Sequence, residues 1–365
     1  EQEGVEVVRG DLAVPEVPAG TGVELPLPEV PALAGESWLT VTATLAEDEP
    51  WGAAGHVVAW GQVQLGQRPP RTPLRPASGD TAREAAPGDD TGVLALGSAR
   101  FDRASGVLVG FGGLAVDGPR LDVWRAPTDN DLGGRQRSVA YAWRRAGLDR
   151  MRHRTVSTGM EDGAFVVRSR VAPAATDLGL RAEYRWSEQD GRLRLDLSVA
   201  PEGDWEELTL PKLGLRMALP AELDQVTWYG LGPGESYRDS RQAARVGRFS
   251  LPVSELQTPY VMPQENGNRS EVRTATFQAA SSPGGTGTGL RVEGDPFFDF
   301  TARRWTAEDL DAARHTSDLR PSDRLHLTLD RAHQGIGTGS CGPGALPQHR
   351  LTAERTSFTV LFSLT

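Results

Sequence analysis

An alternation of apolar and polar residues with a period of two is the main pattern in the second half of the chain. Residues 180–186 and 193–197 alternate cleanly on the two sides of the dipeptide Asp190-Gly191. Because side chains two positions apart lie on the same face of a strand, this pattern predicts two half-buried strands. The Asp-Gly dipeptide is typical of a tight turn, so the segment is predicted to be a β-hairpin.

Further strand patterns cover much of the chain beyond residue 91. Residues 100–102 and 107–109 flank a turn-like segment and predict a second hairpin. More strands are predicted at 213–218, 225–229, 274–279, 325–329 and 357–364. His326 alternates with Leu325 and Leu327, so it is predicted to lie on the polar face of its strand.

Helical signals are rare. Ser138 is a suitable N-cap for a short helix that runs to Ala146 and stops at Gly147. Thr306 and Asp309 have the spacing of a capping box, which predicts another turn or two of helix. Many strands with few helices over residues 91–365 predict an all-β fold, with one large antiparallel sandwich.

The N-terminal part of the chain predicts a smaller β unit and a connection. Residues 1–66 contain two good strand patterns, at 38–44 and 56–65, and Gly61 suggests a bulge in the second. Residues 67–90 are rich in proline and nearly free of large apolar side chains, which is typical of a linker. A unit with so few strands is predicted to leave a sheet edge uncovered.

Composition excludes several classes of function. The net charge of −10 argues against nucleic-acid binding, and no apolar run is long enough to span a membrane. Cys341 is the single cysteine, which excludes an internal disulfide and a cysteine-cluster metal site. The chain starts with Glu-Gln-Glu, without an initiator Met or a signal-peptide pattern, so it is interpreted as a fragment.

Two loops with many polar residues are predicted at 230–239 and 260–269. Each combines glycine, proline, carboxylates and arginine within ten residues, which suits neither a helix nor a regular strand. Tyr237 and Tyr260 are expected to anchor these loops, with buried rings and paired hydroxyls. We favour a bracing role for most of these polar residues, and binding or catalysis by Glu235 and Glu265 is the alternative.

Other candidate chemistry is weaker. Asp129 and Asp131 are a nearby carboxylate pair, but a turn-capping role is favoured over acid–base catalysis. Residues 337–342 match G-x-G-x-x-G, yet prolines follow where a dinucleotide site requires a helix, so a loop is predicted. Six histidines show no tight metal-ligand spacing. Among them His333, beside this glycine loop, is the best functional candidate, although a structural role is favoured.

Four motifs together carry a family resemblance. They are the segments 124–131 (WRAPTDND), 230–239, 260–269 and 333–337 (HQGIG). In this order they resemble the C-terminal region of the large bacterial β-galactosidases of glycoside hydrolase family 2. The resemblance extends from about Gly10 to the end of the chain. It implies a partial immunoglobulin-like linker domain at 1–66 and a large galactose mutarotase-like supersandwich at 91–365.

The resemblance also implies where the chemistry lies. In that family the catalytic glutamates, the magnesium and sodium sites and most sugar-binding residues belong to a TIM barrel that would precede residue 1. No catalytic residue and no cofactor are therefore expected in this chain. A mobile loop that starts near Gly133, Gly134 and Arg135 is expected at the periphery of the substrate site. Cys341 is expected there too, in the place of a tryptophan that stacks on the sugar.

The implied partners are a galactoside, bound through the barrel, and further copies of the same subunit in a cytoplasmic enzyme. Two alternatives stay open. The sandwich itself could be a carbohydrate-binding module, or it could be a sugar epimerase. An epimerase needs a histidine and a carboxylate that converge on one sugar ring, for which His333 with Glu235 or Glu265 is the candidate set.

Overall fold

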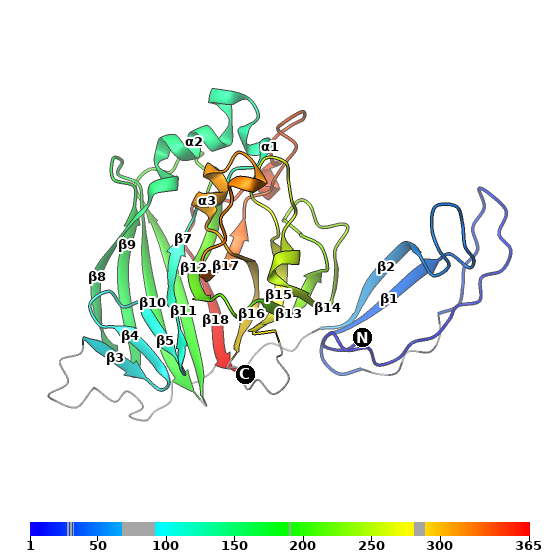
Figure 1. The fold of residues 1–365 in the computed structure, drawn as a ribbon, viewed down its shortest axis with the longest axis horizontal. Coiled ribbons are helices and arrows are strands. Elements are labelled where there is room, and N and C mark those ends of the chain that lie inside the picture. Colours follow the sequence, from blue (N-terminus) through cyan, green and yellow to red (C-terminus); the bar gives the residue numbers. More distant parts are fainter. Residues whose placement is uncertain (28, 30, 32, 68–91, 190, 281–288) are drawn as a thin grey trace. The chain divides into compact units, whose positions relative to one another are not determined.

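The structure is a computed structural model that describes residues 1–365 except 28, 30, 32, 68–91, 190 and 281–288 (Figure 1). It contains two compact units, Glu1–Arg71 with Arg245–Arg248 and the remainder of the chain. The predicted linker at 67–90 falls, apart from residue 67, outside the described residues. In the described part of the chain, no helix has the length and apolar character needed to cross a membrane.

The N-terminal unit is built around one antiparallel pair, β1 (Ser37–Thr44) and β2 (Val57–Gly66). Gly61 lies in regular register opposite Val41, so the predicted bulge at Gly61 is wrong. The register shifts fall instead near the strand ends, beside Ser37 and Thr44. Among the described residues of this unit no second sheet covers the pair, and many apolar side chains of the two strands remain exposed.

The sandwich unit is almost entirely antiparallel β-structure. Its strands are β3 (Val93–Leu96), β4 (Ala99–Asp102), β5 (Leu108–Phe111), β6 (Leu114–Ala115), β7 (Asp117–Asp122), β8 (Arg152–Glu161), β9 (Ala164–Ala172), β10 (Gly179–Gln189), β11 (Arg192–Glu202), β12 (Lys212–Pro220), β13 (Gln225–Gly232), β14 (Arg245–Pro252), β15 (Arg269–Gln278), β16 (Leu290–Arg303), β17 (Arg324–His333) and β18 (Thr356–Leu364). This arrangement confirms the predicted all-β fold class.

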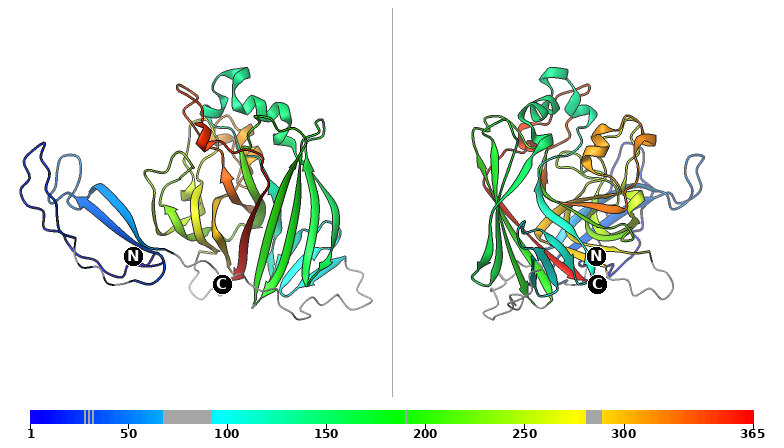
Figure 2. Two further views of the ribbon diagram at one scale, coloured as in Figure 1. Left: turned by 180° about the vertical axis from the view of Figure 1, so that it is seen from behind. Right: turned by 60° about the vertical axis from the view of Figure 1, so that its left-hand side comes forward.

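Twelve of these strands form one curled sheet, drawn in Figures 1 and 2. Its main path runs β14-β13-β15-β16-β18-β11-β10-β9-β8, and β17, β12 and β7 continue it from β16. A second sheet has the order β3-β4-β5-β6. The two predicted hairpins are confirmed, since Gln189 pairs with Arg192 and Phe101 pairs with Leu108.

The helices are short, and two of them begin at the predicted N-caps Ser138 and Thr306. They are α1 (Asp129–Leu132), α2 (Val139–Ala146) and α3 (Ala307–Ala312), with 3-10 turns η1 (Arg135–Arg137), η2 (Leu148–Arg150), η3 (Val253–Leu256), η4 (Thr316–Asp318) and η5 (Pro347–His349). Ser138 Oγ accepts the Tyr141 amide, and Gly147 ends α2 with φ +80°. Thr306 and Asp309 form the predicted capping box of α3.

Aromatic rings occupy the core between the layers. Phe101 from the small sheet lies 5.1 Å from both Phe165 and Trp186 of the large sheet, measured between ring centroids. A second group surrounds Phe300, which is fully buried and contacts Phe277 and Trp228 edge to face. Such contacts add specific ring geometry to the hydrophobic burial that holds the two layers together.

We expect Phe300→Ala to lower the free energy of unfolding by about 3–5 kcal/mol, because it leaves a cavity among rings that cannot fully collapse. Urea denaturation followed by tryptophan fluorescence measures the change. Val156→Ala is the control, since this side chain is 66% exposed and its loss is expected to cost less than about 0.5 kcal/mol. Equal effects of the two substitutions would contradict the assignment of this core.

Candidate functional site

Four neighbouring strands, β7, β12, β17 and β16, have one apolar face and one polar face. In β17, Leu325, Leu327 and Leu329 belong to the core. His326, Thr328 and Asp330 alternate with them and therefore lie on the other face. The predicted position of His326 on a polar strand face is thereby confirmed.

Strand register aligns the polar residues of these four strands. Asp122 of β7 pairs with Gly214 of β12, Gly214 with Asp330 of β17, and Asp330 with Asp299 of β16. Directly paired residues have their side chains on the same face of a sheet. A row of acidic positions therefore crosses the polar face.

A cavity of about 390 Å³ opens on this face. Its floor includes Thr301, Thr328 and His333, and both Trp124 and Trp305 contribute to its lining. Exposed side chains such as Glu308 form its rim. Pockets for small molecules usually measure about 300–1,000 Å³, so the cavity is large enough for one small ligand.

The buried carboxylate of Asp330 lies beneath the cavity and accepts hydrogen bonds from three side chains. Lys212 Nζ lies 2.9 Å from Oδ1, Thr328 Oγ1 lies 2.7 Å from Oδ2, and His333 Nε2 lies 2.9 Å from Oδ2. Lys212 also forms an ion pair with Asp122 at 3.1 Å. The cluster thus joins β7, β12 and β17 on the cavity side.

Gly214 permits this cluster. A Cβ atom at this position would lie 2.0 Å from Asp330 Oδ1. The register between β12 and β17 also shifts between Leu213 and Gly214, beside Lys212. The close approach of the Asp330 carboxylate to β12 therefore requires a residue without a side chain.

The protonation of the cluster follows from its contacts. Burial alone would raise the pKa of Asp330, but the charge of Lys212 and the bond from His333 lower that pKa to about 2. Burial would likewise lower the pKa of Lys212, yet Asp330 and Asp122 raise it. Asp330 is therefore a carboxylate at neutral pH and can only accept, so His333 carries its proton on Nε2.

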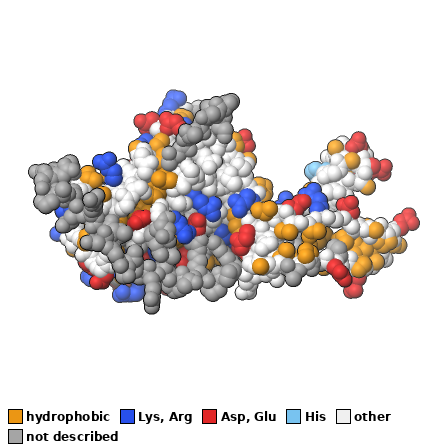
Figure 3. Space-filling model, turned by 90° about the horizontal axis from the view of Figure 1, so that it is seen from below, with side chains coloured by type: hydrophobic (Ala, Val, Ile, Leu, Met, Phe, Trp, Pro, Cys, Tyr) orange, Lys and Arg blue, Asp and Glu red, His pale blue; other side chains and the backbone are white. Residues whose placement is uncertain are grey.

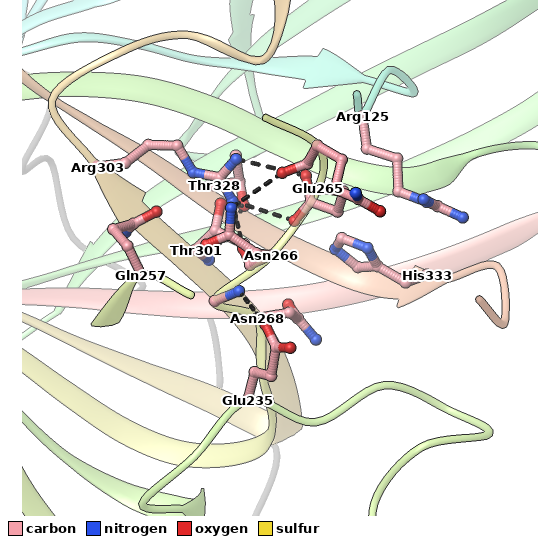
Figure 4. A network of polar contacts seen from close by, with 12 residues as sticks. Arg125, Glu235, Gln257, Glu265, Asn266, Asn268, Thr301, Arg303, Thr328 and His333 are labelled. Atoms are coloured by element: carbon pink, nitrogen blue, oxygen red, sulfur yellow. Dashed lines mark hydrogen bonds and ion pairs between the residues drawn. The ribbon is translucent and has the colours of Figure 1, made fainter. Parts of the chain in front are cut away.

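A second buried ion pair joins the loop 260–269 to β16 (Figure 4). Arg303 Nη2 donates to Glu265 Oε1 at 3.0 Å and to the carbonyl of Asn266 at 2.7 Å. Burial opposes ionisation of Glu265, but Arg303, His333 and Arg125 together lower its pKa. Glu265 and His333 therefore lie in one electrostatic cluster, and both line the cavity.

Charges in the cavity lining balance. The four ion pairs are Asp117–Arg120, Asp122–Lys212, Glu265–Arg303 and Glu308–Arg216. Each acidic residue of the lining thus has a basic partner within the same lining. The cavity has no net formal charge, so its electrostatics favour neither an anion nor a cation.

Three buried nitrogen atoms of residues that line the cavity have no hydrogen-bond partner among the described residues. They are His333 Nδ1, Arg303 Nε and Trp305 Nε1. Asn268 Oδ1 and Gln257 Oε1, which belong to residues outside the lining, share this property, so it is not confined to the cavity.

The structure places Glu235 outside this group. Its carboxylate accepts the Tyr260 hydroxyl at 2.9 Å and the Gly267 amide at 2.6 Å, so it joins the two predicted loops. It is not among the residues that line the cavity. The set proposed for an epimerase is thus reduced to His333 and Glu265.

Hydrogen bonds join the two polar loops to each other. The Ser236 amide donates to the Asn268 carbonyl at 2.9 Å, and Asn268 Nδ2 donates to the Ser236 carbonyl at 2.8 Å. Tyr237 is buried, and its hydroxyl lies 3.4 Å from Glu265. The expected burial of Tyr260 is wrong, since this ring is 38% exposed where the loop turns outward.

Asp129 and Asp131 have the favoured structural roles. Asp131 completes the capping box of α1 with Thr128 and forms a bidentate ion pair with the fully buried Arg125, at 2.7 and 3.1 Å. The Asp129 amide and carboxylate both bond to the side chain of Gln264. Both aspartates therefore hold the 124–131 segment against its neighbours.

Gly133 and Cys341 lie in segments that touch. Asn130 Nδ2 donates to the Gly337 carbonyl at 2.8 Å, and Asn130 Oδ1 accepts the Ser340 hydroxyl at 2.7 Å. A Cβ atom on Gly133 would lie 1.9 Å from the Gly339 carbonyl oxygen. The two segments that were each expected at the periphery of the substrate site therefore contact each other.

The structure also places Gly134, Arg135 and Cys341, the other residues expected at the periphery of the substrate site. Gly134 has φ +85°, and Cys341 is exposed. The backbone of Arg135 begins η1, and its side chain lies outside the described part of the chain. Residues 337–342 contain no helix and form a loop, as predicted from the prolines that follow.

Sequence reasoning missed Lys212, Asp330, Arg303 and Trp305 as site residues. A signal existed for the first: Lys212 is the single lysine among 39 basic residues, and it stands at the start of a strongly apolar strand. Arg303 was missed because its partner Glu265 is 38 residues away. Asp330 has two partners close in sequence, Thr328 and His333, but its counter-charge Lys212 is 118 residues away.

We expect Lys212→Met to lower the free energy of unfolding at pH 7 by about 3–5 kcal/mol, because two carboxylates would lose their buried counter-charge. The control is Arg216→Met, which breaks an exposed pair on the same strand and is expected to cost less than about 1 kcal/mol. Urea denaturation measures both changes, and equal losses would contradict the role of the cluster.

The same variant tests the pKa of Asp330. Because the folded-state pKa of about 2 lies below the ordinary value of 3.8, Asp330 stabilises the fold above pH 3.8. That contribution, about 2 kcal/mol, is lost as the pH falls towards 2. We expect Lys212→Met to reduce this part of the acid-induced loss, measured as unfolding free energy between pH 5 and pH 2, while the bond from His333 preserves the remainder.

Comparison with known proteins gives the family. A model described as "Beta galactosidase small chain" matches residues 97–362, and one described as "Beta-galactosidase, domain 4" matches residues 1–66. A β-galactosidase of Arthrobacter sp. (strain B7) is 36% identical over 382 residues, covering 97% of this chain and 36% of the relative. A β-galactosidase of Vibrio cholerae serotype O1 is 31% identical and covers 92% and 33%, respectively.

The chain therefore spans about a third of the length of these curated relatives. Among solved structures, a galactose mutarotase related enzyme of Lactobacillus acidophilus aligns with a TM-score of 0.36 and 6% identity, covering 75% of this chain and 94% of that one. Since the small-chain model matches well over half of its residues, the chain belongs to the β-galactosidase small-chain family.

Proposed function

We propose that this chain is the non-barrel part of a β-galactosidase that hydrolyses terminal β-D-galactosides, such as lactose, with retention of configuration. The observation that carries the proposal is the small-chain match over residues 97–362, together with relatives that bear the name β-galactosidase and are about three times as long. In this proposal the chain completes and covers an active site whose catalytic carboxylates belong to the rest of the enzyme.

The carboxylates on the polar face are paired with bases, which supports the proposal that the catalytic carboxylates belong to the rest of the enzyme. A retaining glycosidase needs two carboxyl groups about 5–5.5 Å apart, one of them protonated to act as the acid. Each acidic side chain of the cavity lining is instead paired with a base, and Arg303 holds Glu265 as a carboxylate. Burial raises the pKa of Asp299 to about 6, but Asp299 is not among the lining residues.

The contact between Gly133 and the 339–340 segment supports the covering role. Asn130 bonds to both Gly337 and Ser340, so movement of one segment is transmitted to the other. Glycines on both sides of the contact allow the two backbones to approach closely. Two joined loops at one end of a rigid sandwich are suitable for closing over a bound substrate.

The N-terminal unit supports the proposal that further protein covers this chain. Val57, Val58 and Val63 of β2 are each 46–53% exposed, and Trp51 is 64% exposed. Apolar side chains lie along this unit in Figure 3. Because soluble proteins seldom expose large apolar patches, we propose that the rest of the enzyme or a second subunit buries this surface.

The remaining parts of the proposal follow from the resemblance. The galactoside is bound mainly by the barrel, and the magnesium and sodium ions of the family are held outside this chain. The complete enzyme is proposed to be a cytoplasmic homo-oligomer.

We expect the purified chain to release no product from a chromogenic galactoside, because the reacting carboxylates are absent from it. The complete reading frame, expressed in the same host, is expected to be active. Detectable turnover by the chain alone, or a complete reading frame without galactosidase activity, would refute the proposal. The upstream DNA is expected to encode a barrel with paired glutamates.

In the complete enzyme, we expect Gly133→Ala to lower kcat/KM by about tenfold, because the new Cβ displaces the 339–340 segment. The backbone itself accepts alanine, since φ at Gly133 is −55°. Gly344→Ala is the control, because nothing lies within 4 Å of its Cβ position. Unchanged kinetics in Gly133→Ala, at unchanged thermal stability, would exclude a role for this contact.

A further inference from the structure

We propose that the loop segment Tyr260-Val261-Met262, called the apolar tip below, is a docking contact that the complete enzyme buries against its catalytic part. The existence of that part rests on the proposed function, which assigns the catalytic carboxylates to the rest of the enzyme. The apolar tip is then a surface through which the sandwich and the catalytic part meet.

The apolar tip is exposed along its whole length. Val261 is 88% exposed, Met262 is 42% exposed and Tyr260 is 38% exposed. In the described part of the sandwich unit, this is the one run of three consecutive large apolar side chains that are all exposed. Single apolar residues are common on protein surfaces, whereas contiguous ones mark contacts with other molecules. The exposure of the tip therefore indicates a partner.

Hydrogen bonds fix the conformation of the apolar tip. The Tyr260 hydroxyl donates to Glu235 Oε1 at 2.9 Å, and the Tyr260 amide donates to the Thr258 carbonyl at 2.8 Å. The Met262 carbonyl accepts a bond from Gln264 Nε2 at 3.2 Å. A loop that is already ordered loses little conformational entropy on binding, so most of the free energy from burying its apolar surface is available for docking.

A short series of contacts connects the apolar tip to the segments that are proposed to cover the substrate. Gln264, which bonds to the Met262 carbonyl, also bonds to the amide and the carboxylate of Asp129. The next residue, Asn130, bonds to Ser340. Figure 1 shows α1 and the red loop before η5 at the same end of the sandwich. The tip therefore belongs to the end of the sandwich that is proposed to meet the active site.

The small size of the apolar tip favours a partner within the same polypeptide over a second copy of the chain. Stable interfaces between separate proteins bury about 800 Å² on each side and use about 20–30 residues of each partner. Three side chains provide far less, so the tip alone does not hold two subunits together. Within one polypeptide the connecting chain creates a high effective concentration, and a small contact is sufficient.

The chemistry of the apolar tip favours a protein recess over a lipid surface. Segments that bind membranes combine apolar side chains with lysine and arginine, which attract anionic lipids. Lys212, the single lysine of the chain, is buried elsewhere, and the side chain that holds Tyr260 is the carboxylate of Glu235. We therefore expect the recess on the catalytic part to be lined by apolar side chains.

Methionine oxidation tests the burial of the apolar tip. Met262 is 42% exposed and Met160 of β8 is 36% exposed, so brief treatment with hydrogen peroxide is expected to oxidise both in the 365-residue chain. In the complete enzyme, we expect oxidation of Met262 to slow at least about fivefold, while Met160 keeps its rate. Peptide mass spectrometry measures both rates. Equal oxidation of Met262 in the two proteins would overturn the proposal.

A photo-crosslinker identifies the partner. With p-benzoylphenylalanine in place of Val261, irradiation of the complete enzyme is expected to link this position to peptides from the catalytic part of the same polypeptide. A doubled mass on a denaturing gel would identify a second copy as the partner. Sedimentation of the 365-residue chain with phosphatidylglycerol vesicles would identify a membrane contact. Either result, or the absence of crosslinks, would contradict docking on the catalytic part.

A charge on the apolar tip tests its contribution to stability. We expect Val261→Asp to lower the thermal midpoint of the complete enzyme by at least about 2 °C, because an unpaired carboxylate would be buried in an apolar recess. In the 365-residue chain the same substitution is expected to change nothing, since Val261 is 88% exposed there. Val156→Asp, at a 66% exposed position of β8, is the matched control and is expected to change neither midpoint.

Unchanged stability of the complete enzyme in Val261→Asp would count against the docking contact. Galactosidase activity of the same samples tests the proposed function separately, because oxidation rates, crosslinks and thermal midpoints do not require turnover. An active complete enzyme with an unprotected Met262 would therefore overturn the docking contact alone. An inactive complete enzyme would refute the proposed function, whatever the state of the apolar tip.

Discussion

The buried carboxylate of Asp330 is the interaction on which the polar face of the sandwich depends. Removing a carboxylate from water costs several kcal/mol unless charge and hydrogen bonds replace its hydration. Lys212 provides the charge, and Thr328 and His333 provide two further bonds. Because Lys212 also reaches Asp122, one cation holds three strands in register.

This cluster is possible because the sheet has two faces of opposite character. The apolar face of β12, β16 and β17 packs into the aromatic core, and that packing fixes the backbone positions. The opposite face can then hold polar side chains at short distances, and the pairs of Lys212 with Asp122 and Asp330 link its strands. The face towards the core is constrained by packing.

Sequence reasoning predicted the local structure well and the site only in part. Alternation identified β10, β11, β12 and β17, and the caps at Ser138 and Thr306 identified two helices, because these signals are contained within a few residues. It placed His326 on the correct face for the same reason. Pairing across the chain was not accessible in this way. The ion pair between Glu265 and Arg303 joins positions 38 residues apart, and the bond between Lys212 and Asp330 joins positions 118 apart.

Two predictions from the sequence were wrong, the bulge at Gly61 and the burial of Tyr260, and both errors have physical causes. Gly61 permits a bulge but does not require one, and β1 and β2 pair regularly around it. Tyr260 lies in a turn whose neighbour Val261 is 88% exposed, so its ring leaves the core while its hydroxyl still reaches Glu235. In both cases the residue type suggested a local geometry that the surrounding chain did not impose.

Complete hydrogen bonding explains several of the buried polar residues that have a structural role in this molecule. Asp131 forms a bidentate pair and a helix cap, and Glu235 accepts two donors from the loop it braces. His333 and Arg303 are equally buried, and each bonds to a carboxylate, Asp330 and Glu265 respectively. Each also has a buried nitrogen without a partner among the described residues, but the bracing residue Asn268 has a buried oxygen without one, so an open hydrogen bond does not by itself mark a binding residue. What distinguishes His333 and Arg303 from Asp131 and Glu235 is that they line the cavity.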